Sequence, residues 1–285
     1  MTKGRKPSFS KHLPRKRFGQ NFLQDPGIID QIIHAIRPQT GDLMVEIGPG
    51  LGALTEHLVD QVGQLAVVEL DRDLIPNLRI SFATRKNFHI YEGDALKFDY
   101  RRIPSDLCGE QAATTKMRIV GNLPYNISTP LLFHLIEYQN QIGDMHFMLQ
   151  KEVVDRMAAG VGDNAYGRLG IMIQYYCKVE PLFLVPPHAF NPPPKVDSAI
   201  VRLVPHEQRP VTTQCTSSLN KIVTAAFNQR RKTIRNALKS IADDALLEAA
   251  GIDPEVRPEQ VSLAQYAHLT DLTLANEPPN AKLPS

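Results

Sequence analysis

Val45-Glu-Ile-Gly-Pro-Gly-Leu-Gly52 is the stretch that decides the fold, because an apolar run gives way within it to closely spaced glycines. The apolar residues Leu43 to Ile47 predict a buried strand, and the glycines predict a turn into a helix that begins near Leu51. Glycines let the backbone approach a bound ligand closely, although a purely structural turn is the alternative. Strand, glycine turn and helix in this order indicate an α/β fold with a binding site at the end of the strand.

Further short β-branched runs follow, with helical patterns between them. Nearly continuous apolar strands that alternate with helices indicate a parallel sheet covered on both faces, so we expect a doubly wound α/β domain. Two later apolar segments would form an antiparallel pair at the sheet edge. The expected strands are Leu43–Ile47, Leu65–Leu70, Phe88–Tyr91, Arg118–Val120 and Met145–Leu149, and the later pair is Val179–Val185 and Ala199–Val204.

The pattern changes after Pro205, where no further strand is expected. Phe227, Ile234, Leu238 and Ile241 share one helical face, which indicates a smaller all-α domain. We therefore expect an N-terminal segment at residues 1–24, an α/β domain at 25–207, a helical domain at 208–275 and a tail at 276–285.

The composition excludes several classes of protein. With 42% hydrophobic and 22% charged residues, the chain is an ordinary globular protein. Its three widely spaced cysteines give neither a disulfide framework nor a zinc-binding pattern, so we expect a reducing cytoplasm and no metal. No segment has the length and apolarity of a membrane span, and no apolar core of a secretory signal follows the basic N-terminus. We expect a monomer that does not enter a membrane.

The net charge of +2 conceals two basic segments on an acidic body. Residues 1–17 hold seven basic side chains and residues 221–240 hold six, with no acid in either segment, while the other 248 residues carry a net charge of −11. Such segments fit phosphate contacts along structured RNA, although a solvated helix face is the alternative. The candidate RNA contacts are Arg15, Lys16, Arg17, Arg230, Arg231, Lys232, Arg235 and Lys239.

Acidic residues end two of the expected strands. Glu69 follows Gly48 by 21 residues, where its carboxylate can accept hydrogen bonds from both hydroxyls of a ribose. Asp94 can accept the exocyclic amine of an adenine, or it can cap a helix or turn. Because an acidic rim would serve a pyrophosphate poorly, these residues favour a nucleoside without phosphates, such as S-adenosylmethionine, over a dinucleotide.

Asn122-Leu-Pro-Tyr125 follows the fourth expected strand and can supply a reaction. An adenine amino nitrogen is a weak nucleophile, because its lone pair is delocalised into the ring. If the Asn122 side-chain oxygen and the Leu123 carbonyl accept its two hydrogens, that lone pair becomes available without a strong general base. Pro124 stiffens the turn, and Tyr125 can stack on the base, a contact worth roughly 1–3 kcal/mol. An Asn-Pro turn with a surface tyrosine is the alternative.

Phe190 lies in a proline-rich stretch, residues 186–194, that would hold its ring rigidly at the mouth of the site. We expect it to face Tyr125 and to sandwich a flipped adenine, since chemistry on a base requires taking it out of the stack. Packing into the core is the alternative.

Six motifs, in order, resemble those of the bacterial ribosomal RNA adenine dimethyltransferases, from about Arg15 to the 260s. They are Arg17-Phe-Gly-Gln-Asn-Phe-Leu23, Glu46-Ile-Gly-Pro-Gly50, Val68-Glu-Leu-Asp71, Gly93-Asp-Ala95, Asn122-Leu-Pro-Tyr-Asn126 and Phe227-Asn-Gln-Arg-Arg-Lys-Thr-Ile-Arg235. Leu123, where many DNA-modifying relatives have a second proline, favours the RNA branch.

The resemblance implies a Rossmann-like class I methyltransferase sheet that uses S-adenosylmethionine. It implies dimethylation of two adjacent adenosines near the 3′ end of 16S ribosomal RNA, and a role in the biogenesis of the small subunit. It also implies that the segment before residue 25 folds over the cofactor. The implied cofactor contacts are Asn21, Leu23, Gly48, Glu69, Asp94 and Asn122.

Three other functions stay open. A nicotinamide-dependent oxidoreductase would explain the glycine turn and Glu69, but not Asn122–Tyr125. A non-catalytic ribosome assembly factor could use the same basic segments. The related large-subunit dimethyltransferase that confers antibiotic resistance shares the catalytic half, but its resemblance is weaker at Phe227–Arg235.

Overall fold

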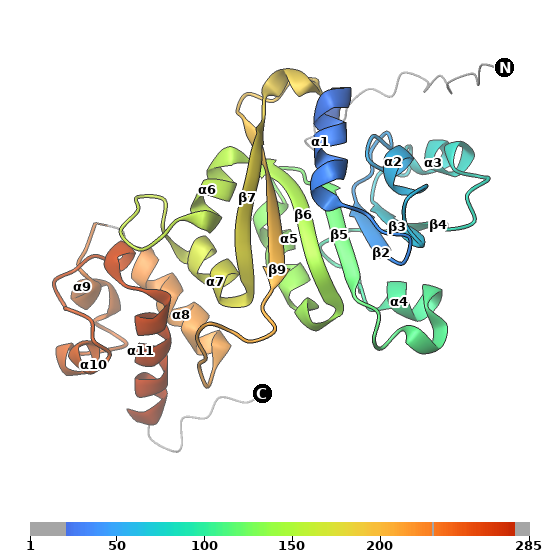
Figure 1. Cartoon of the computed structure of the whole chain (residues 1–285). Coiled ribbons are helices and arrows are strands. Elements are labelled where there is room, and N and C mark those ends of the chain that lie inside the picture. Colours follow the sequence, from blue (N-terminus) through green and yellow to red (C-terminus); the bar gives the residue numbers. More distant parts are fainter. Residues whose placement is uncertain (1–20, 230, 277–285) are drawn as a thin grey trace. The chain divides into compact units, whose positions relative to one another are not determined.

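The structure, a computed structural model, describes residues 21–229 and 231–276. Two compact units make it up (Figure 1). The first unit contains the chain up to Val154 together with Glu180–Pro205, and the second contains Asp155–Val179 and the chain from His206 onward. The sequence predicted a domain boundary after residue 207, and the first unit ends at Pro205. Nothing in the sequence indicated that Asp155–Val179 belongs to the helical unit.

A seven-stranded sheet forms the framework of the first unit, in the order β4-β3-β2-β5-β6-β9-β7. Strands β2 to β6 pair in parallel, and β9 runs antiparallel to β6. All seven expected strands are present, and the two later ones lie at one edge as expected. Their bounds are β2 Leu43–Ile47, β3 Gln64–Glu69, β4 Phe88–Glu92, β5 Met117–Asn122, β6 Ile142–Gln150, β7 Cys177–Val185 and β9 Ser198–Pro205.

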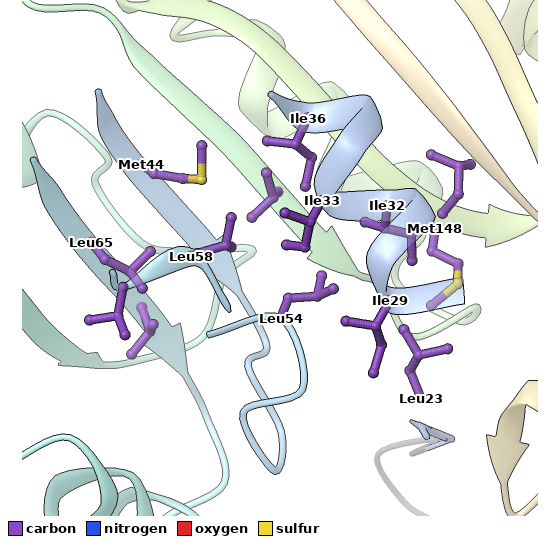
Figure 2. Close-up of a cluster of buried hydrophobic side chains, with 14 of the residues drawn as sticks. Leu23, Ile29, Ile32, Ile33, Ile36, Met44, Leu54, Leu58, Leu65 and Met148 are labelled. Atoms are coloured by element: carbon purple, nitrogen blue, oxygen red, sulfur yellow. The ribbon is translucent and has the colours of Figure 1, made fainter. Parts of the chain in front are cut away.

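Helices pack on this sheet through apolar faces. In α1, Asp25 caps the first turn by accepting hydrogen bonds from Gly27 N and Ile28 N, at 2.9 and 3.1 Å. Four isoleucines of α1, labelled in Figure 2, belong to one apolar cluster with Leu54 and Leu58. The helices of this unit are α1 Pro26–Ile36, α2 Thr55–Leu58, α3 Ile75–Ser81, α4 Arg102–Leu107 and α5 Ser128–Ile136, and α6 Lys151–Ala158 begins in it.

The helix expected to begin near Leu51 begins instead at Thr55, so that expectation was wrong. Gly50 and Gly52 have φ angles of 59° and 86°, and Gly48 has a φ of 66°. A right-handed helix cannot continue through such angles. The chain therefore makes turns from Gly50 to Leu54 before α2 starts.

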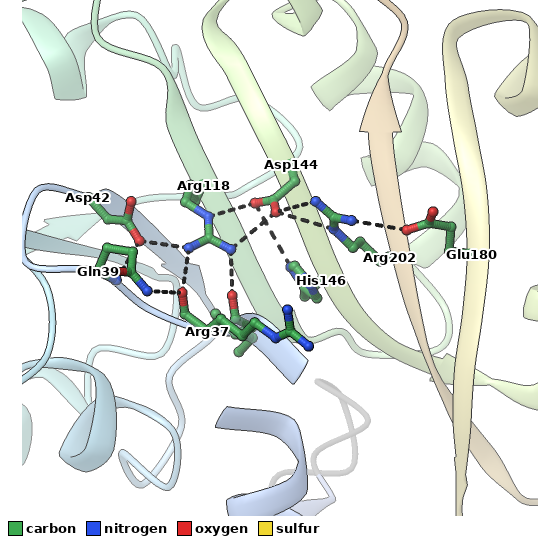
Figure 3. Close-up of polar contacts among 9 residues, drawn as sticks. Arg37, Gln39, Asp42, Arg118, Asp144, His146, Glu180 and Arg202 are labelled. Atoms are coloured by element: carbon green, nitrogen blue, oxygen red, sulfur yellow. Dashed lines mark hydrogen bonds and ion pairs between the residues drawn. The ribbon is translucent and has the colours of Figure 1, made fainter. Parts of the chain in front are cut away.

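An ion-pair network lies at the amino ends of β5 and β6 (Figure 3). The Arg118 guanidinium is 2.7 Å from the Asp42 carboxylate and 2.8 Å from that of Asp144, and it also donates to the last carbonyls of α1. Arg202 joins Asp144 to Glu180 on β7. Charged groups thus fix α1 and four strands at the sheet edge opposite the carboxyl ends of β2 to β5.

The second unit is helical, and its described part has no strand after Pro205. Phe227 and Ile241 do not lie on one continuous helix as expected, because α8 ends at Phe227 and extended backbone at Thr233 precedes α9. Among the described residues, no helix has the length and apolarity needed to cross a bilayer. This unit holds the end of α6, then α7 Arg168–Tyr176, α8 Thr216–Phe227, α9 Ile234–Leu238, α10 Asp244–Ala249 and α11 Leu263–Asn276.

Candidate active site

A pocket of about 330 Å³ opens at the carboxyl ends of β2, β3, β4 and β5. The strand order reverses between β2 and β5, and ligands of open α/β sheets bind at such a switch point. Four chain segments after these strands line the pocket, and the segment Asn21–Leu23 completes it. The expected binding site therefore forms at the expected edge of the sheet.

All charged side chains among the described lining residues of the pocket are acidic. Glu46, Glu69, Asp71 and Asp94 line it, whereas none of its described lining residues is Lys, Arg or His. Among these described residues, a phosphate group would find four carboxyl groups and no basic side chain. The lining therefore suits a ligand that is cationic and free of phosphate, as S-adenosylmethionine is.

Glu69 is held at the end of β3 by backbone donors. Its Oε1 accepts a hydrogen bond from Asp71 N at 2.8 Å, and its Oε2 lies 3.4 Å from Gly50 N in the glycine turn. Burial raises the pKa of this carboxyl above its usual range, and the backbone donors oppose that rise. A carboxylate fixed in this way can accept hydrogen bonds from ribose hydroxyls.

Glu46 is a pocket residue that the sequence did not reveal as one. Only 2% of it is exposed, and Thr55 Oγ1 donates to its Oε2 at 2.6 Å. Burial raises the pKa of its carboxyl from 4.5 to about 7. The available signal was a single acid inside Leu43–Ile47, a strand that is otherwise apolar and buried throughout. Such a residue is costly to bury, and so is a candidate for function.

Asp94 lies in the loop after β4, which we define as residues 93–100 and call the Asp94 loop. Asp94 Oδ1 accepts a hydrogen bond from Leu96 N at 3.0 Å, so the residue does stabilise a turn. It also lines the pocket together with Ala95 and Leu96. The turn role and a ligand role are therefore compatible, because a carboxylate has two oxygens.

Asn122 ends β5 at the pocket, and its side-chain amide has a defined orientation. The amide Nδ2 donates to the main-chain oxygen of Asn21 at 3.0 Å. Only the nitrogen of an amide can donate to a carbonyl, so this bond identifies which side-chain atom is the oxygen. Leu123 N donates to Met148 O on β6, and Ile127 N donates to Pro124 O to close the turn. The Asn122 oxygen is thus held as an acceptor on a rigid turn.

Tyr125 lines the pocket and is half-buried. Its hydroxyl lies 2.7 Å from Ser198 Oγ on β9, and its main-chain oxygen accepts a hydrogen bond from Ser128 Oγ at 3.1 Å. The first contact holds the hydroxyl end of the ring, and the second holds the main chain of the residue. A tyrosine face held in this way can serve as a platform for a base.

Phe190 does not stand at the mouth of the pocket as the sequence suggested. It is 4% exposed, lies within the apolar cluster of α1 and is not part of the pocket lining. Strand β8, Phe190–Asn191, pairs antiparallel with β1, Phe22–Leu23, which draws the ring inward. Phe190 packs into the core in this structure, as the alternative stated, and its stacking on a target base stays a prediction.

The segment Asn21–Leu23 borders the pocket, as the resemblance implied for Asn21 and Leu23. Phe22 also lines the pocket and was not anticipated. Its ring lies 3.2 Å from the position that a Cβ on Gly50 would occupy, so Gly50 makes this close approach possible. Among the described residues, apart from its two chain neighbours, a Cβ on Gly48 would meet no atom within 4 Å, so the backbone there is open to a ligand.

The structure describes four of the eight candidate RNA contacts. Arg15, Lys16, Arg17 and Arg230 lie outside the described residues. Arg231, Lys232 and Lys239 are exposed on the second unit. Arg235, in contrast, is ion-paired with Asp244 at 2.7 Å and with Glu255 at 2.5 Å.

Known proteins resemble this chain over most of its length. A family model described as ribosomal RNA adenine dimethylase matches residues 11–274. A protein of Pseudomonas putida named ribosomal RNA small subunit methyltransferase A is 57% identical over 91% of this chain and 95% of its own length. A protein of that name from Vibrio cholerae is 54% identical over 91% and 93%.

Solved structures resemble the fold. A dimethyladenosine transferase from Plasmodium falciparum is 29% identical, with a TM-score of 0.73 over 87% of this chain and 95% of that one. The 23S rRNA methyltransferase ErmE is 24% identical, with a TM-score of 0.68 over 89% and 99%. At that identity, the second likeness concerns the fold alone.

Proposed function

The chain belongs to the ribosomal RNA adenine dimethylase family, and from this premise we propose that it dimethylates two adjacent adenosines near the 3′ end of 16S ribosomal RNA. The methyl groups come from S-adenosylmethionine and are placed on the exocyclic N6 amines. The observation that carries the proposal is the oriented amide of Asn122, fixed by Asn21 at the edge of an acidic pocket.

The pocket residues fit the cofactor by their chemistry. We assign Glu69 to the ribose hydroxyls and Asp94 to the adenine amine, because each presents carboxylate oxygens to the pocket. The open backbone at Gly48 and the segment Asn21–Leu23 would complete the binding site. When bound, the cofactor supplies an electrophilic methyl group, and S-adenosylhomocysteine remains after transfer. No metal is required for this chemistry.

Asn122 and Leu123 then act on the amine of the target adenine. The Asn122 side-chain oxygen and the Leu123 carbonyl accept its two hydrogens, which makes the nitrogen lone pair available. Tyr125, fixed by Ser198, supplies the surface on which the base lies. The methylated nitrogen loses its proton to solvent or to a carbonyl, so no strong general base is needed.

The basic side chains of the second unit are proposed RNA contacts. Arg231, Lys232 and Lys239 are exposed there, and phosphate contacts of this kind position RNA without reading its sequence. We further propose that the substrate is the small ribosomal subunit or its precursor, that the protein acts as a monomer in the cytoplasm, and that it contributes to subunit biogenesis.

The test is transfer of label from S-adenosylmethionine to purified ribosomal subunits that lack the modification. We expect dimethyladenosine in small-subunit RNA, mapped to two adjacent positions. We expect Asn122→Ala to reduce the transfer rate by at least about 100-fold, as loss of one aligned transition-state contact does, with subunit binding retained. Label on large-subunit RNA would overturn the substrate assignment. An unchanged rate for Asn122→Ala would overturn the role of that residue.

Cofactor choice is tested separately. S-adenosylhomocysteine should bind the purified protein, and NAD should not, because a pyrophosphate would face the acidic lining of the pocket. Binding of NAD with comparable affinity would favour the oxidoreductase alternative.

A further inference from the structure

The Asp94 loop has more anchoring than its own turn provides. At its start, Gly93 N donates to Glu69 O at 3.0 Å. Two of its later carbonyls accept hydrogen bonds from side chains: Tyr100 Oη donates to Ala95 O at 3.1 Å, and His134 Nε2 lies 2.9 Å from Phe98 O. The second bond comes from a different element, the helix α5.

Helix α5 is joined to the opposite wall of the pocket. It begins at Ser128, directly after Ile127, the last residue of the lining segment that starts at Asn122. Its apolar face is buried, with Leu131, Leu132 and Leu135 at most 1% exposed. His134, on the same helix, holds the Asp94 loop. One rigid helix thus carries both the catalytic turn at one end and a tether to the cofactor loop near the other.

Aromatic packing fixes the His134 ring. The ring of Tyr100, which is fully buried, lies 5.8 Å from that of His134 and 5.4 Å from that of Tyr138. His134 and Tyr138 are nearly perpendicular, with 5.3 Å between their ring centres. Such edge-to-face contacts restrict the orientation of a ring. Because a carbonyl can only accept, the proton must lie on Nε2, and Nδ1 faces Glu137 at 3.6 Å.

We propose that His134 is a positioning residue for cofactor binding. It touches neither substrate nor cofactor; it sets the position of the Asp94 loop, and through that loop the affinity for the adenosine part of S-adenosylmethionine. The inference rests on the cofactor role proposed above for Asp94. It adds a specific consequence: the hydrogen bond from His134 to Phe98 O should influence cofactor affinity and not the methyl-transfer step.

The experiment compares two replacements of His134 that differ in one property. His134→Gln retains an N–H that can donate to Phe98 O, whereas His134→Phe retains a ring and loses the donor. His57→Gln, at the exposed end of α2, is the matched control. For each protein we would measure the dissociation constants of S-adenosylmethionine and of 5′-methylthioadenosine, and the KM and kcat for methyl transfer.

Phe98 O also accepts a longer hydrogen bond from Tyr138 Oη, at 3.4 Å, which His134→Phe leaves in place. We therefore expect His134→Phe to weaken both ligands by about threefold to tenfold, up to the size of one well-formed hydrogen bond. Its kcat at saturating cofactor should stay within about twofold of wild type, and His134→Gln should restore most of the affinity. The loss should be as large for 5′-methylthioadenosine, which lacks the amino-acid part, because the Asp94 loop serves the adenosine part.

Three results would overturn the inference: unchanged affinity in His134→Phe, a kcat that falls as far as the affinity, or equal losses in both variants. If His134→Phe does not fold, Tyr100→Phe removes the bond to Ala95 O and should give the same pattern. Cofactor binding is measured without RNA. Failure of wild type to methylate small-subunit RNA would therefore refute the proposed function without altering this result.

Discussion

Glu46 should make cofactor binding depend on pH. Burial raises its pKa to about 7, so in the free protein this carboxyl is protonated through the weakly acidic range. S-adenosylmethionine carries a permanent positive charge on sulfur as well as an ammonium group. A cation in the same pocket favours the carboxylate, so binding should lower the pKa of Glu46 and release a proton.

The size of the effect follows from the pKa. A rise of the Glu46 pKa from 4.5 to about 7 makes its ionisation about 3 kcal/mol more costly in the free protein than in water, at roughly 1.4 kcal/mol per pKa unit. If binding restores the ordinary pKa, the affinity should increase by up to about tenfold per pH unit below pH 7, and by about 40-fold between pH 5 and 7. Above pH 7 it should level off, because the carboxyl is ionised in the free protein as well.

The raised pKa of Glu46 should also make the free energy of unfolding depend on pH. The folded protein holds the Glu46 proton up to about pH 7, whereas the unfolded chain releases it near 4.5. The contribution of Glu46 to stability is therefore most favourable below 4.5 and is lost as the pH rises to 7. Glu46→Gln should remove this dependence, which urea unfolding at pH 5 and pH 8 would measure.

Calorimetric titration of wild type and Glu46→Gln with S-adenosylmethionine, from pH 5 to 8 in two buffers of different ionisation enthalpy, measures both affinity and released protons. Wild type should release protons below pH 7, and Glu46→Gln should release fewer protons and give a shallower slope. The slope that remains comes from Glu69, whose pKa is also raised by burial. S-adenosylhomocysteine lacks the charge on sulfur and should give a shallower slope. Glu92→Gln, at the exposed end of β4 and outside the pocket lining, is the control. Equal wild-type affinity at pH 5 and 7, or a slope that Glu46→Gln leaves unchanged, would refute the reasoning.

Three further predictions concern the same two units. Tyr125→Phe and Ser198→Ala each remove the 2.7 Å contact between the two hydroxyls and should each lower kcat by about fivefold to tenfold. The double variant should be no slower than either single variant. Additive losses would show that the two residues do not act through this contact. The Arg235 side chain is ion-paired, so Arg235→Ala should lower the thermal stability of the second unit and leave the salt dependence of subunit binding unchanged. Lys232→Ala should instead reduce the slope of log affinity against log salt concentration by about one. Gly50→Ala should weaken S-adenosylmethionine at least about tenfold in a binding titration, because its φ is 59° and its Cβ would lie 3.2 Å from the Phe22 ring.

Local chemistry made part of this site predictable from the sequence. In a parallel sheet the residues that follow the strands meet at one edge, so Glu69, Asp94 and Asn122 could be brought together before their contacts were known. Glu46 escaped notice because it lies inside a strand, where burial and not position makes it chemically unusual. The start of α2 was misplaced because the positive φ angles at Gly50 and Gly52 depend on how the turn folds, which composition does not fix.

Contacts between distant residues account for the rest. Phe190 pairs with Leu23, 167 positions earlier, through a ladder of two residues on each strand. So short a pairing has no periodic pattern to reveal it, and the surrounding prolines indicated rigidity without indicating direction. Asp155–Val179 likewise joins the helical unit through side chains distant in sequence, such as Tyr166, whose hydroxyl donates to Val261 O.

The same distant pairing bears on the orientation of the Asn122 amide. Main-chain bonds hold the segment after Asn21, since β1 pairs with β8 and Gln24 N donates to Ala189 O at 2.8 Å. The main-chain oxygen of Asn21, the residue directly before β1, is the acceptor that orients Asn122. Phe190 packs into the core beside this pairing. We therefore predict that it anchors the segment that borders the pocket, and through that segment the amide of Asn122. Replacing Phe190 by alanine should consequently weaken cofactor binding as well as methyl transfer, whereas a ring that only stacked on the target base would leave cofactor affinity unchanged.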